Sequence, residues 1–349
     1  MSGPGGNRRM QGERGAALIM VLLVITILVV VVIEGVRTMQ VDLAGSAALH
    51  KGFESKHAAL SGLEMAKRVL LEDLNGESGA DHEGEPWADF LRQDEVPLPD
   101  IREHLQGTIV DEHSKFPINS LLDEEGSVSR PHRAVLHNLL TGPVFGLSDE
   151  DADAMIAAFV DWLDTNHEPA GFSGAEDDTY QLDSVGYEAR DGEIRSLAEV
   201  RLIKGITDAL YYGTEGNPGL MDLLTVYSRD SVNINTASPQ LLAALIKQDE
   251  SGIRPEEAWE FALEMVEYRR DPMHFEDLSS PGWYTNVLGS LSIHLHDVVT
   301  TESSVYSVSL TARSGSGQRR LFAVLERSGP VGETQDEQAQ ATTSFLELQ

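Results

Sequence analysis

The sequence contains no cysteine and few basic residues. In 349 residues, 26 Lys and Arg stand against 57 Asp and Glu, which gives a formal net charge of −31. Without cysteine, disulfide bridges, thiolate catalysis and zinc–thiolate sites are excluded. A chain so poor in cations is also unsuited to nucleic acid, because phosphate contacts need clustered Lys and Arg. The acidic surplus instead favours solubility and the binding of cations.

Motifs typical of enzymes are absent as well. The sequence has no Walker loop, HExxH, GxSxG or dinucleotide-binding fingerprint. We therefore expect that the chain is not an enzyme. Its apolar content of 41% is enough for a substantial core. A chain of this length is expected to form about two domains beyond any membrane anchor.

A long apolar run near the N-terminus is the first positive feature. Residues 16–33 carry no charge and are rich in Val, Leu and Ile, and three arginines precede the run while none lies within it. As a helix the run would extend about 27 Å, close to the hydrocarbon thickness of a bilayer. The pattern predicts a single-pass transmembrane segment whose N-terminus lies in the cytoplasm.

The leader before this run separates three interpretations. Residues 1–15 are polar and basic, and they end in Gly15 directly before Ala16. A secretory signal peptide would be cleaved beyond the apolar run, after small residues, and residues 32–37 match that pattern poorly. A plain signal anchor needs no particular junction. The leader instead resembles a pilin-type signal, which is cleaved between the glycine and the first apolar residue.

The helix is expected to continue beyond the membrane. Residues 34–74 contain no proline, and apolar residues recur on one side at helical spacing, namely Phe53, Leu60, Leu63, Ala66, Leu70 and Leu74. Asn75-Gly76 then forms a stop signal. One helix over residues 16–74 would be about 88 Å long, half in lipid and half packed on a globular head.

Strand patterns flank a mainly helical block in the remainder of the chain. Residues 107–110 predict a strand from which residues 116–119 return. Helical patterns cover residues 130–142, 149–163, 196–205, 217–224, 238–248 and 255–269. Near the C-terminus, alternating apolar residues on both sides of Gly315 and Gly317 predict a hairpin. The composition of residues 328–349 predicts a disordered tail.

These segments predict an α+β fold. A pilin-like long N-terminal helix would pack on a small antiparallel sheet. Residues 34–119 would supply the helix and the first strands, and residues 291–327 the C-terminal strands. A large, mainly helical domain would be inserted between them over residues 120–290.

An acidic stretch without Lys or Arg runs between Arg133 and Arg190. Clustered carboxylates repel one another, and calcium relieves that cost in irregular loops because it accepts about six to eight oxygen ligands. The candidate ligands are Asp161, Asp164, Asn166, Glu168, Glu176, Asp177 and Asp178. An EF-hand is not expected, since Pro169 and Ala175 stand where its glycine and glutamate belong. A solvated acidic surface and a catalytic carboxylate pair are the alternatives.

The segment VNINTASPQLL, Val232 to Leu242, is similar to the start of helix-hairpin-helix DNA-binding modules. Ser238 is placed to cap a helix and Pro239 to occupy its first position. Those modules continue with a glycine-rich hairpin that holds phosphate, whereas residues 246–254 are not glycine-rich and lie in acidic surroundings. We therefore expect helix-hairpin-helix- or SAM-like parts without nucleic-acid binding. A membrane-tethered DNA-uptake receptor is the alternative.

Taken in order, these features resemble protein K of the type II secretion system, a family of large minor pseudopilins. The markers are the leader junction and residues 111–119, 159–164, 174–178 and 232–242. The resemblance implies that prepilin peptidase cuts after Gly15 and methylates Ala16. It also implies calcium in the helical domain, an inner-membrane anchor and a periplasmic head. The chain would join the I- and J-type minor pseudopilins at the tip of a pseudopilus that supports protein export across the outer membrane.

Met20 gives the implied tip position a physical reason. Major pilins carry Glu at the fifth mature position, where it pairs with the charged N-terminus of a neighbour, and Met20 is the equivalent residue here. A subunit without that carboxylate cannot form the pair within lipid. It can still occupy an end, where one neighbour is missing. A minor pilin of a type IV pilus is the alternative within this class.

Overall fold

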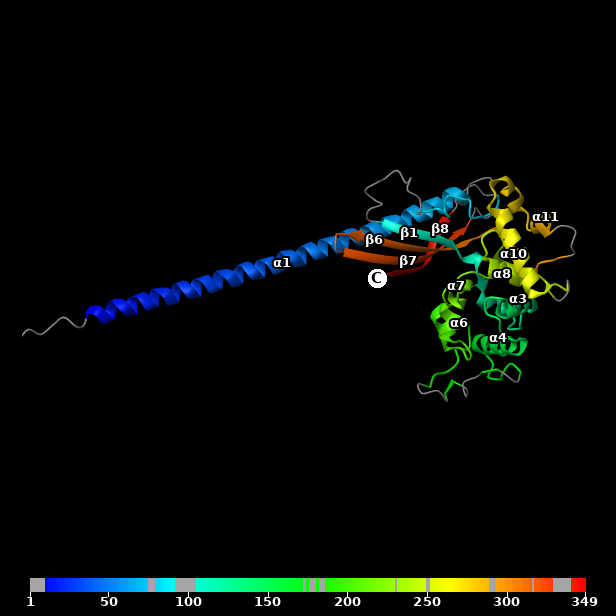
Figure 1. The fold of residues 1–349 in the computed structure, drawn as a ribbon, viewed down its shortest axis with the longest axis horizontal. Helices are drawn as coiled ribbons and strands as arrows, with labels where there is room; N and C mark the ends of the chain where they lie inside the picture. The colour runs from blue at the N-terminus through cyan, green and yellow to red at the C-terminus, as the bar shows by residue number, and fades with distance from the viewer. Residues whose placement is uncertain are drawn as a thin grey trace, which may run out of the picture.

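The structure, a computed structural model, describes residues 10–74, 79–91, 105–171, 174–175, 180–181, 186–229, 231–248, 252–288, 293–315, 317–328 and 340–349. Helix α1 (Met10–Leu74) projects from a folded head as a single rod (Figure 1). The long helix expected over residues 16–74 is confirmed, and it begins earlier, at Met10. Residues 1–9 of the expected leader lie outside the described residues.

Only the C-terminal part of α1 is covered by the head. Large apolar side chains from Leu18 to Phe53 are exposed, whereas Ala59, Leu63 and later residues of the predicted apolar side are buried. Within the described ranges, α1 is the one helix that is long and apolar enough to cross a membrane.

The covered part of α1 packs on a four-stranded antiparallel sheet. The strands are β1 (Leu105–Asp111), β6 (Val305–Ser314), β7 (Gly317–Ser328) and β8 (Gln340–Leu348), in the order β1-β6-β7-β8. Alternate residues of β6, from Tyr306 to Ala312, are buried toward the helix, as the period-two pattern predicts. Gly62 allows this close approach, because a Cβ there would lie 2.8 Å from a methyl carbon of Leu105. The predicted hairpin of β6 and β7 is confirmed.

The C-terminal segment corrects one expectation. Residues 340–348, placed in a disordered tail by composition, form β8 and pair with β7. Phe345 packs near Phe322 of β7, with ring centroids 6.1 Å apart. Without β8, one edge of β7 would present unpaired backbone groups, and the Thr and Phe side chains of the segment suit a strand. Residues 329–339 of the expected tail lie outside the described residues.

The expected return of residues 116–119 beside β1 is also wrong. Strand β2 (Phe116–Pro117) pairs in parallel with β3 (Leu224–Thr225), and a 3₁₀ helix, η2 (Ile118–Leu121), follows. The place beside β1 belongs to β6, which is about 200 residues later in the chain. The pairing of β1 with the distant strand β6, which buries apolar residues against α1, is thus favoured over a local turn back from β1.

The middle of the chain forms a mainly helical region at the far end of the head (Figure 1). Its longest helices are α3 (Arg130–Thr141), α4 (Asp149–Leu163) and α10 (Pro255–Arg270). The shorter elements are η1 (Glu112–Ser114), η3 (Leu197–Leu202), α6 (Asp208–Tyr212), α7 (Leu220–Leu223), β4 (Val232–Asn233), α8 (Pro239–Leu245), η4 (Pro272–His274), η5 (Asp277–Ser279), α11 (Tyr284–Leu288) and β5 (Val299–Thr300).

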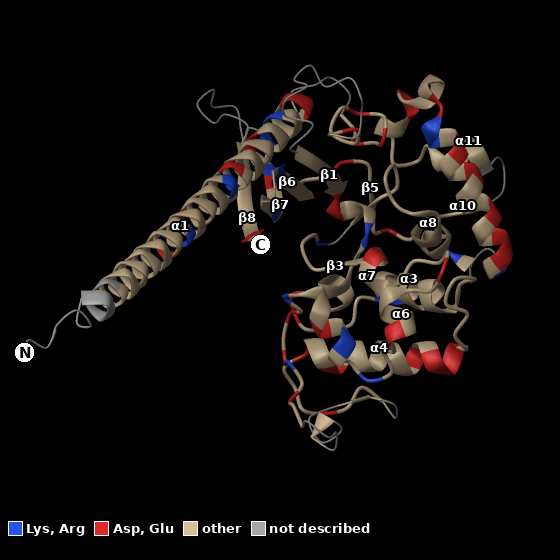
Figure 2. Cartoon of the chain, turned by 60° about the vertical axis from the view of Figure 1, so that its left-hand side comes forward, with Lys and Arg blue, Asp and Glu red and all other residues tan. Residues whose placement is uncertain are grey.

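Local signals explain where several of these helices begin. The Ser148 hydroxyl accepts a hydrogen bond from the Asp151 amide at α4, and the Ser238 hydroxyl accepts one from the Leu241 amide at α8. The helical region has an apolar core of its own, separate from the core between α1 and the sheet. Asp and Glu are prominent on α4 and α10 (Figure 2).

Candidate functional site

The predicted processing junction lies on the uncovered part of α1. Gly15 and Ala16 are exposed, and no atom of another element lies within 4 Å of the position of a Cβ at Gly15. Met20 is 66% exposed. The head therefore leaves the junction and the fifth residue after it accessible to a peptidase and to neighbouring chains.

The stalk of α1, residues 34–53, has unusual surface chemistry. It lies beyond the uncharged run, yet Val36, Met39, Leu43, Leu49 and Phe53 are each more than half exposed. Several of these residues are three or four positions apart, so they share a helix face. Exposed apolar side chains arranged in this way are typical of a surface that contacts another molecule.

The acidic loop after α4 uses its carboxylates in two ways. Asp161 is fully buried, and its two oxygens accept hydrogen bonds from the amides of Ala170 at 2.7 Å and Ala175 at 2.5 Å. It thereby holds both ends of the loop together. Asp164 accepts from the Asn166 amide at 3.2 Å and from its side chain at 2.8 Å. These bonds fold the loop into tight turns.

The exposed members of the loop border an acidic cleft of about 710 Å³. Half-buried Asp164 and exposed Asn166 contribute to its lining, together with Asp123, Glu124, Glu125 and the ion pair of Glu193 with Arg229. Burial raises the pKa of Asp164, and the charges of Asp161 and Asp191 raise it further, against the opposing hydrogen bonds from Asn166. Such crowded carboxylates attract cations.

The remaining predicted ligands are not all brought to this cleft. Glu168 is exposed and does not line it. Glu176, Asp177 and Asp178 lie outside the described residues.

A second group of carboxylates, which sequence reasoning missed, lies where the sheet meets the helical region. We call Asp73, Asp81, Glu85, Asp111 and Arg327 the junction group. Burial raises the pKa of Asp111 above its ordinary value. The Asp111 carboxylate accepts hydrogen bonds from Thr236 Oγ1 at 2.5 Å, Ser303 Oγ at 2.7 Å, the His113 amide at 2.8 Å and Asn233 Nδ2 at 3.1 Å.

Arg327 provides the positive charge of the junction group. Its guanidinium donates to Asp73 at 2.6 Å and also to Asp81. The carboxylate oxygens of Asp73, Asp81 and Glu85 lie within 4.8 Å of one another, so these residues could bind a metal. Glu85 accepts from Trp87 Nε1 at 2.9 Å. Arginine thus already occupies the position of a counter-ion for two of the three carboxylates.

The VNINTAS segment turns its polar side chains into this junction. Asn233 donates to Asp111 and to Ser303 Oγ, and Asn235 donates to the Leu278 carbonyl at 3.0 Å. Asn235 also accepts from Trp283 Nε1 at 2.8 Å. The asparagines Asn233 and Asn235 within an apolar run were the available sequence signal for a buried polar group. The sequence does not indicate which residues they bond.

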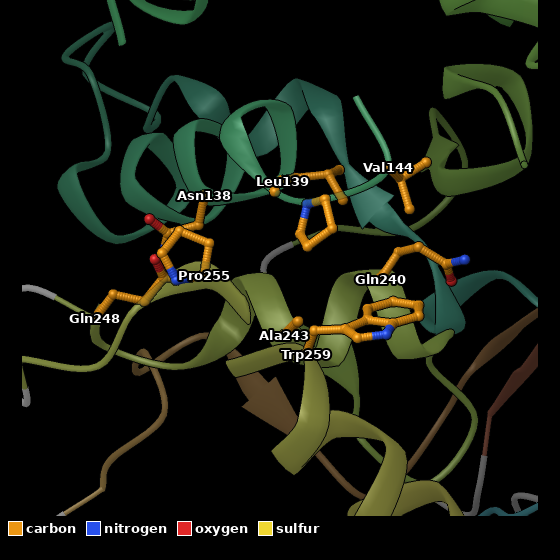
Figure 3. A pocket seen from close by; sticks show the side chains of 10 residues that line it. Asn138, Leu139, Val144, Gln240, Ala243, Gln248, Pro255 and Trp259 are labelled. Atoms are coloured by element: carbon orange, nitrogen blue, oxygen red, sulfur yellow. The ribbon is translucent and has the colours of Figure 1, made fainter. Parts of the chain in front are cut away.

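The crevice where α3, α8 and α10 meet offers little room for a ligand (Figure 3). Asn138, Leu139, Ala243 and Trp259 are among its lining residues. Its volume is about 10 Å³, which is no more than one water molecule needs. This crevice is a packing seam between helices.

Comparisons with known proteins agree with these features. A family model described as "Type II secretion system (T2SS), protein K" matches residues 114–214. The chain is 30% identical over 245 residues to the type II secretion system protein K of Pseudomonas aeruginosa, covering 68% of this chain and 70% of that protein. It is 26% identical over 345 residues to the protein K of Aeromonas hydrophila, covering 91% and 94%.

A solved structure shares the fold. The crystal structure of the GspK-GspI-GspJ complex from the enterotoxigenic Escherichia coli type 2 secretion system contains a chain that matches with a TM-score of 0.55 at 19% identity. The match covers 89% of this chain and 99% of that one. The likeness extends over the long helix, the sheet and the helical region together.

Proposed function

The chain belongs to the type II secretion system protein K family, a family of minor pseudopilins and not of enzymes, and we propose that it occupies the tip of the pseudopilus. There it supports protein export across the outer membrane. The observation that carries this proposal is the division of α1 into an exposed apolar rod and a covered part that bears the head.

The membrane arrangement follows from the same helix. Residues 16–33 span the inner membrane once, the basic leader stays in the cytoplasm, and the head lies in the periplasm. Prepilin peptidase cleaves after Gly15 and methylates Ala16, both of which are exposed on α1.

Two features support a position at the tip. Met20 provides no carboxylate for a neighbour's charged N-terminus, so the chain is suited to an end of the filament. The helical region lies at the end of the head opposite the N-terminal part of α1, where it would obstruct a further subunit (Figure 1). Because a related chain was solved with GspI and GspJ, the partners of this chain are the I- and J-type minor pseudopilins.

The helical region binds calcium and not nucleic acid in this proposal. The acidic cleft beside Asp164 and Asn166 supports the cation. The helix-hairpin-helix- or SAM-like pair of α8 and α10 acts as a scaffold, which the inward polar contacts of Asn233 and Asn235 support.

N-terminal sequencing of the full chain extracted from membranes tests the proposal. We expect a mature chain that begins at methylated Ala16. Gly15→Val should leave the leader attached, because the peptidase needs the glycine at its cleavage site. Gly45→Val is the matched control, since Gly45 is also exposed on α1 with no other element within 4 Å, and it should be processed normally. A native chain that keeps its first 15 residues would refute the assignment.

A further inference from the structure

Five of the 26 basic residues of this acidic chain lie on the C-terminal hairpin and the nearby turns of α1. The hairpin segment 311–320 contains Arg313, Arg319 and Arg320 and no Asp or Glu. Lys51 and Lys56 lie on the neighbouring turns of α1. We call these five residues the basic tip. Such a concentration of cations is unexpected in a chain whose net charge is −31.

Close packing between the hairpin and α1 brings Lys51 and Arg319 to the same place. A Cβ added to Gly317 would lie 3.0 Å from the Lys51 carbonyl oxygen, and Gly315 has a φ of +54°. Arg319 extends along α1 toward Gly52, whereas Arg313 and Arg320 alternate onto the other face of the sheet. The cations therefore surround the end of the hairpin. In Figure 1 this end extends back toward the N-terminal part of α1.

The basic tip forms no close ion pair among the described residues, although Glu347 and Arg320 line the same surface depression. Among the described residues, none of the five cations lies within 4.0 Å of a carboxylate oxygen. Glu54, the acidic residue on the same turns of α1, bonds to Ser314 and lies 3.2 Å from His50. Glu347 of β8 is the nearest acidic residue in register, opposite Phe322. Unrelieved repulsion among the cations is a small cost to folding.

The basic tip lies too far from the membrane surface for anionic lipid to be its partner. Lys51 lies 18 residues beyond Ile33, which corresponds to about 27 Å along a helix. Lipid headgroups add about 5–8 Å to each side of the hydrocarbon core, and salt screens charges beyond about 8 Å. An upright α1 therefore keeps the basic tip clear of anionic lipid. The exposed apolar stalk indicates that proteins fill the intervening space.

We propose that the basic tip docks onto an acidic face of the adjacent pseudopilus subunit on the membrane side of this head. The inference rests on the proposed function, because a subunit at the tip has its neighbours on that side. Complementary charge would steer the approach and set the orientation of the two heads.

Site-specific cross-linking on the full chain tests this proposal. Because the sequence has no cysteine, Gln318→Cys, at an exposed position of the hairpin, introduces a single thiol for a photoreactive maleimide. The labelled chain is produced in membranes with the I- and J-type minor pseudopilins and the major pseudopilin. We expect a cross-link to one of these subunits, on a segment rich in Asp and Glu. Its yield should fall in 0.5 M salt, because the screening length drops from about 8 Å to about 4 Å.

Charge reversal provides the decisive comparison. Arg313→Glu, Arg319→Glu and Arg320→Glu together should lower the cross-link yield about tenfold, and the three Gln replacements should have an intermediate effect. The control reverses three exposed cations of the helical region, Arg130, Arg195 and Lys204, and should change the yield less than about twofold. Equal thermal melting of the two reversed chains shows that both fold.

The outcomes separate the two proposals. A chain that begins at Ala16 but keeps its cross-link yield after reversal of the basic tip overturns the docking inference and leaves the proposed function intact. A cross-link to phospholipid in place of a subunit overturns it as well. A chain that is not processed at Gly15 overturns the proposed function itself.

Discussion

The junction group and the acidic loop after α4 each bring several carboxylates together, but the two groups differ in the burial and bonding of those carboxylates. In the loop, acidic residues are close in sequence, and the structure leaves Asp164 half-buried and Glu168 exposed. In the junction group, Asp73 and Asp81 pair with Arg327, which is more than 200 residues away, and Asp111 is joined to Asp81 through Ser303. Exposed acids of the loop such as Glu168 thus remain solvated, whereas Asp161 and the acids of the junction group are buried with hydrogen-bond donors.

The difference shows what each group can do. Buried carboxylates that accept hydrogen bonds from both parts of the head restrict how those parts sit together, because any displacement would leave charges unpaired. Ser303 illustrates this, since its amide donates to Asp81 and its hydroxyl to Asp111. Exposed carboxylates impose no such restraint and stay available to a cation. We therefore propose that the junction group attaches the helical region and that the loop binds the cation.

Removing the cation of the junction group should have the largest effect. Arg327→Met leaves Asp73 and Asp81 buried without their counter-ion, and we expect a loss of about 3–5 kcal/mol in the free energy of unfolding. Urea unfolding of the detergent-solubilised chain, followed by tryptophan fluorescence, measures it. Arg313→Met at the exposed hairpin is the matched control and should cost less than about 0.5 kcal/mol. Equal losses in the two variants would contradict the role of Arg327.

Replacing Asp111 by an uncharged residue tests how the stability of the junction group depends on pH. Asp111→Asn removes an acceptor of several buried hydrogen bonds, and we expect a loss of about 2–3 kcal/mol. Burial raises the pKa of Asp111 above 3.8 in the folded chain. A carboxyl with a raised folded pKa stabilises the fold most below its unfolded pKa, and this contribution is lost as pH rises through the folded value.

The pH dependence therefore has a definite sign. Because the amide of Asp111→Asn does not ionise, its deficit relative to the native chain should be largest near pH 4 and should shrink toward pH 7, as measured by urea unfolding at each pH. A deficit that grows with pH would mean that the hydrogen bonds from Thr236 and Ser303 outweigh burial at Asp111.

Features with local signals were predictable from the sequence, and features with distant partners were not. The period of apolar residues and the absence of proline predict α1, and the hairpin around Gly315 follows from alternation and turn residues. Helix α4 has the predicted bounds, 149–163, because Ser148 caps it and acidic residues fill its first turn. Each of these signals lies within a few residues of the element it predicts.

The missed features depend on contacts between remote segments. The pairing of β8 with β7 requires an open sheet edge that no property of residues 340–348 reveals. The junction group requires Asp81, Asp111 and Arg327 to meet, and each of them alone is an ordinary charged residue in the sequence. For the same reason, clustering in sequence indicated the acidic loop but could not show that Asp161 is used to close it.

Calcium should distinguish the two groups by the smallest of these effects. At a calcium concentration about 10 times its dissociation constant, the ion should stabilise the chain by about 1.4 kcal/mol, measured by the same urea unfolding. Asp164→Ala should reduce this gain, because Asp164 lines the acidic cleft. Glu85→Gln, its counterpart in the junction group, should retain it, since Arg327 already offsets the neighbouring carboxylates.

Magnesium should act more weakly, because it requires a more regular arrangement of oxygens. If Glu85→Gln abolished the response and Asp164→Ala preserved it, the ion would belong to the junction, and if millimolar calcium had no effect on the native chain, neither group would bind it.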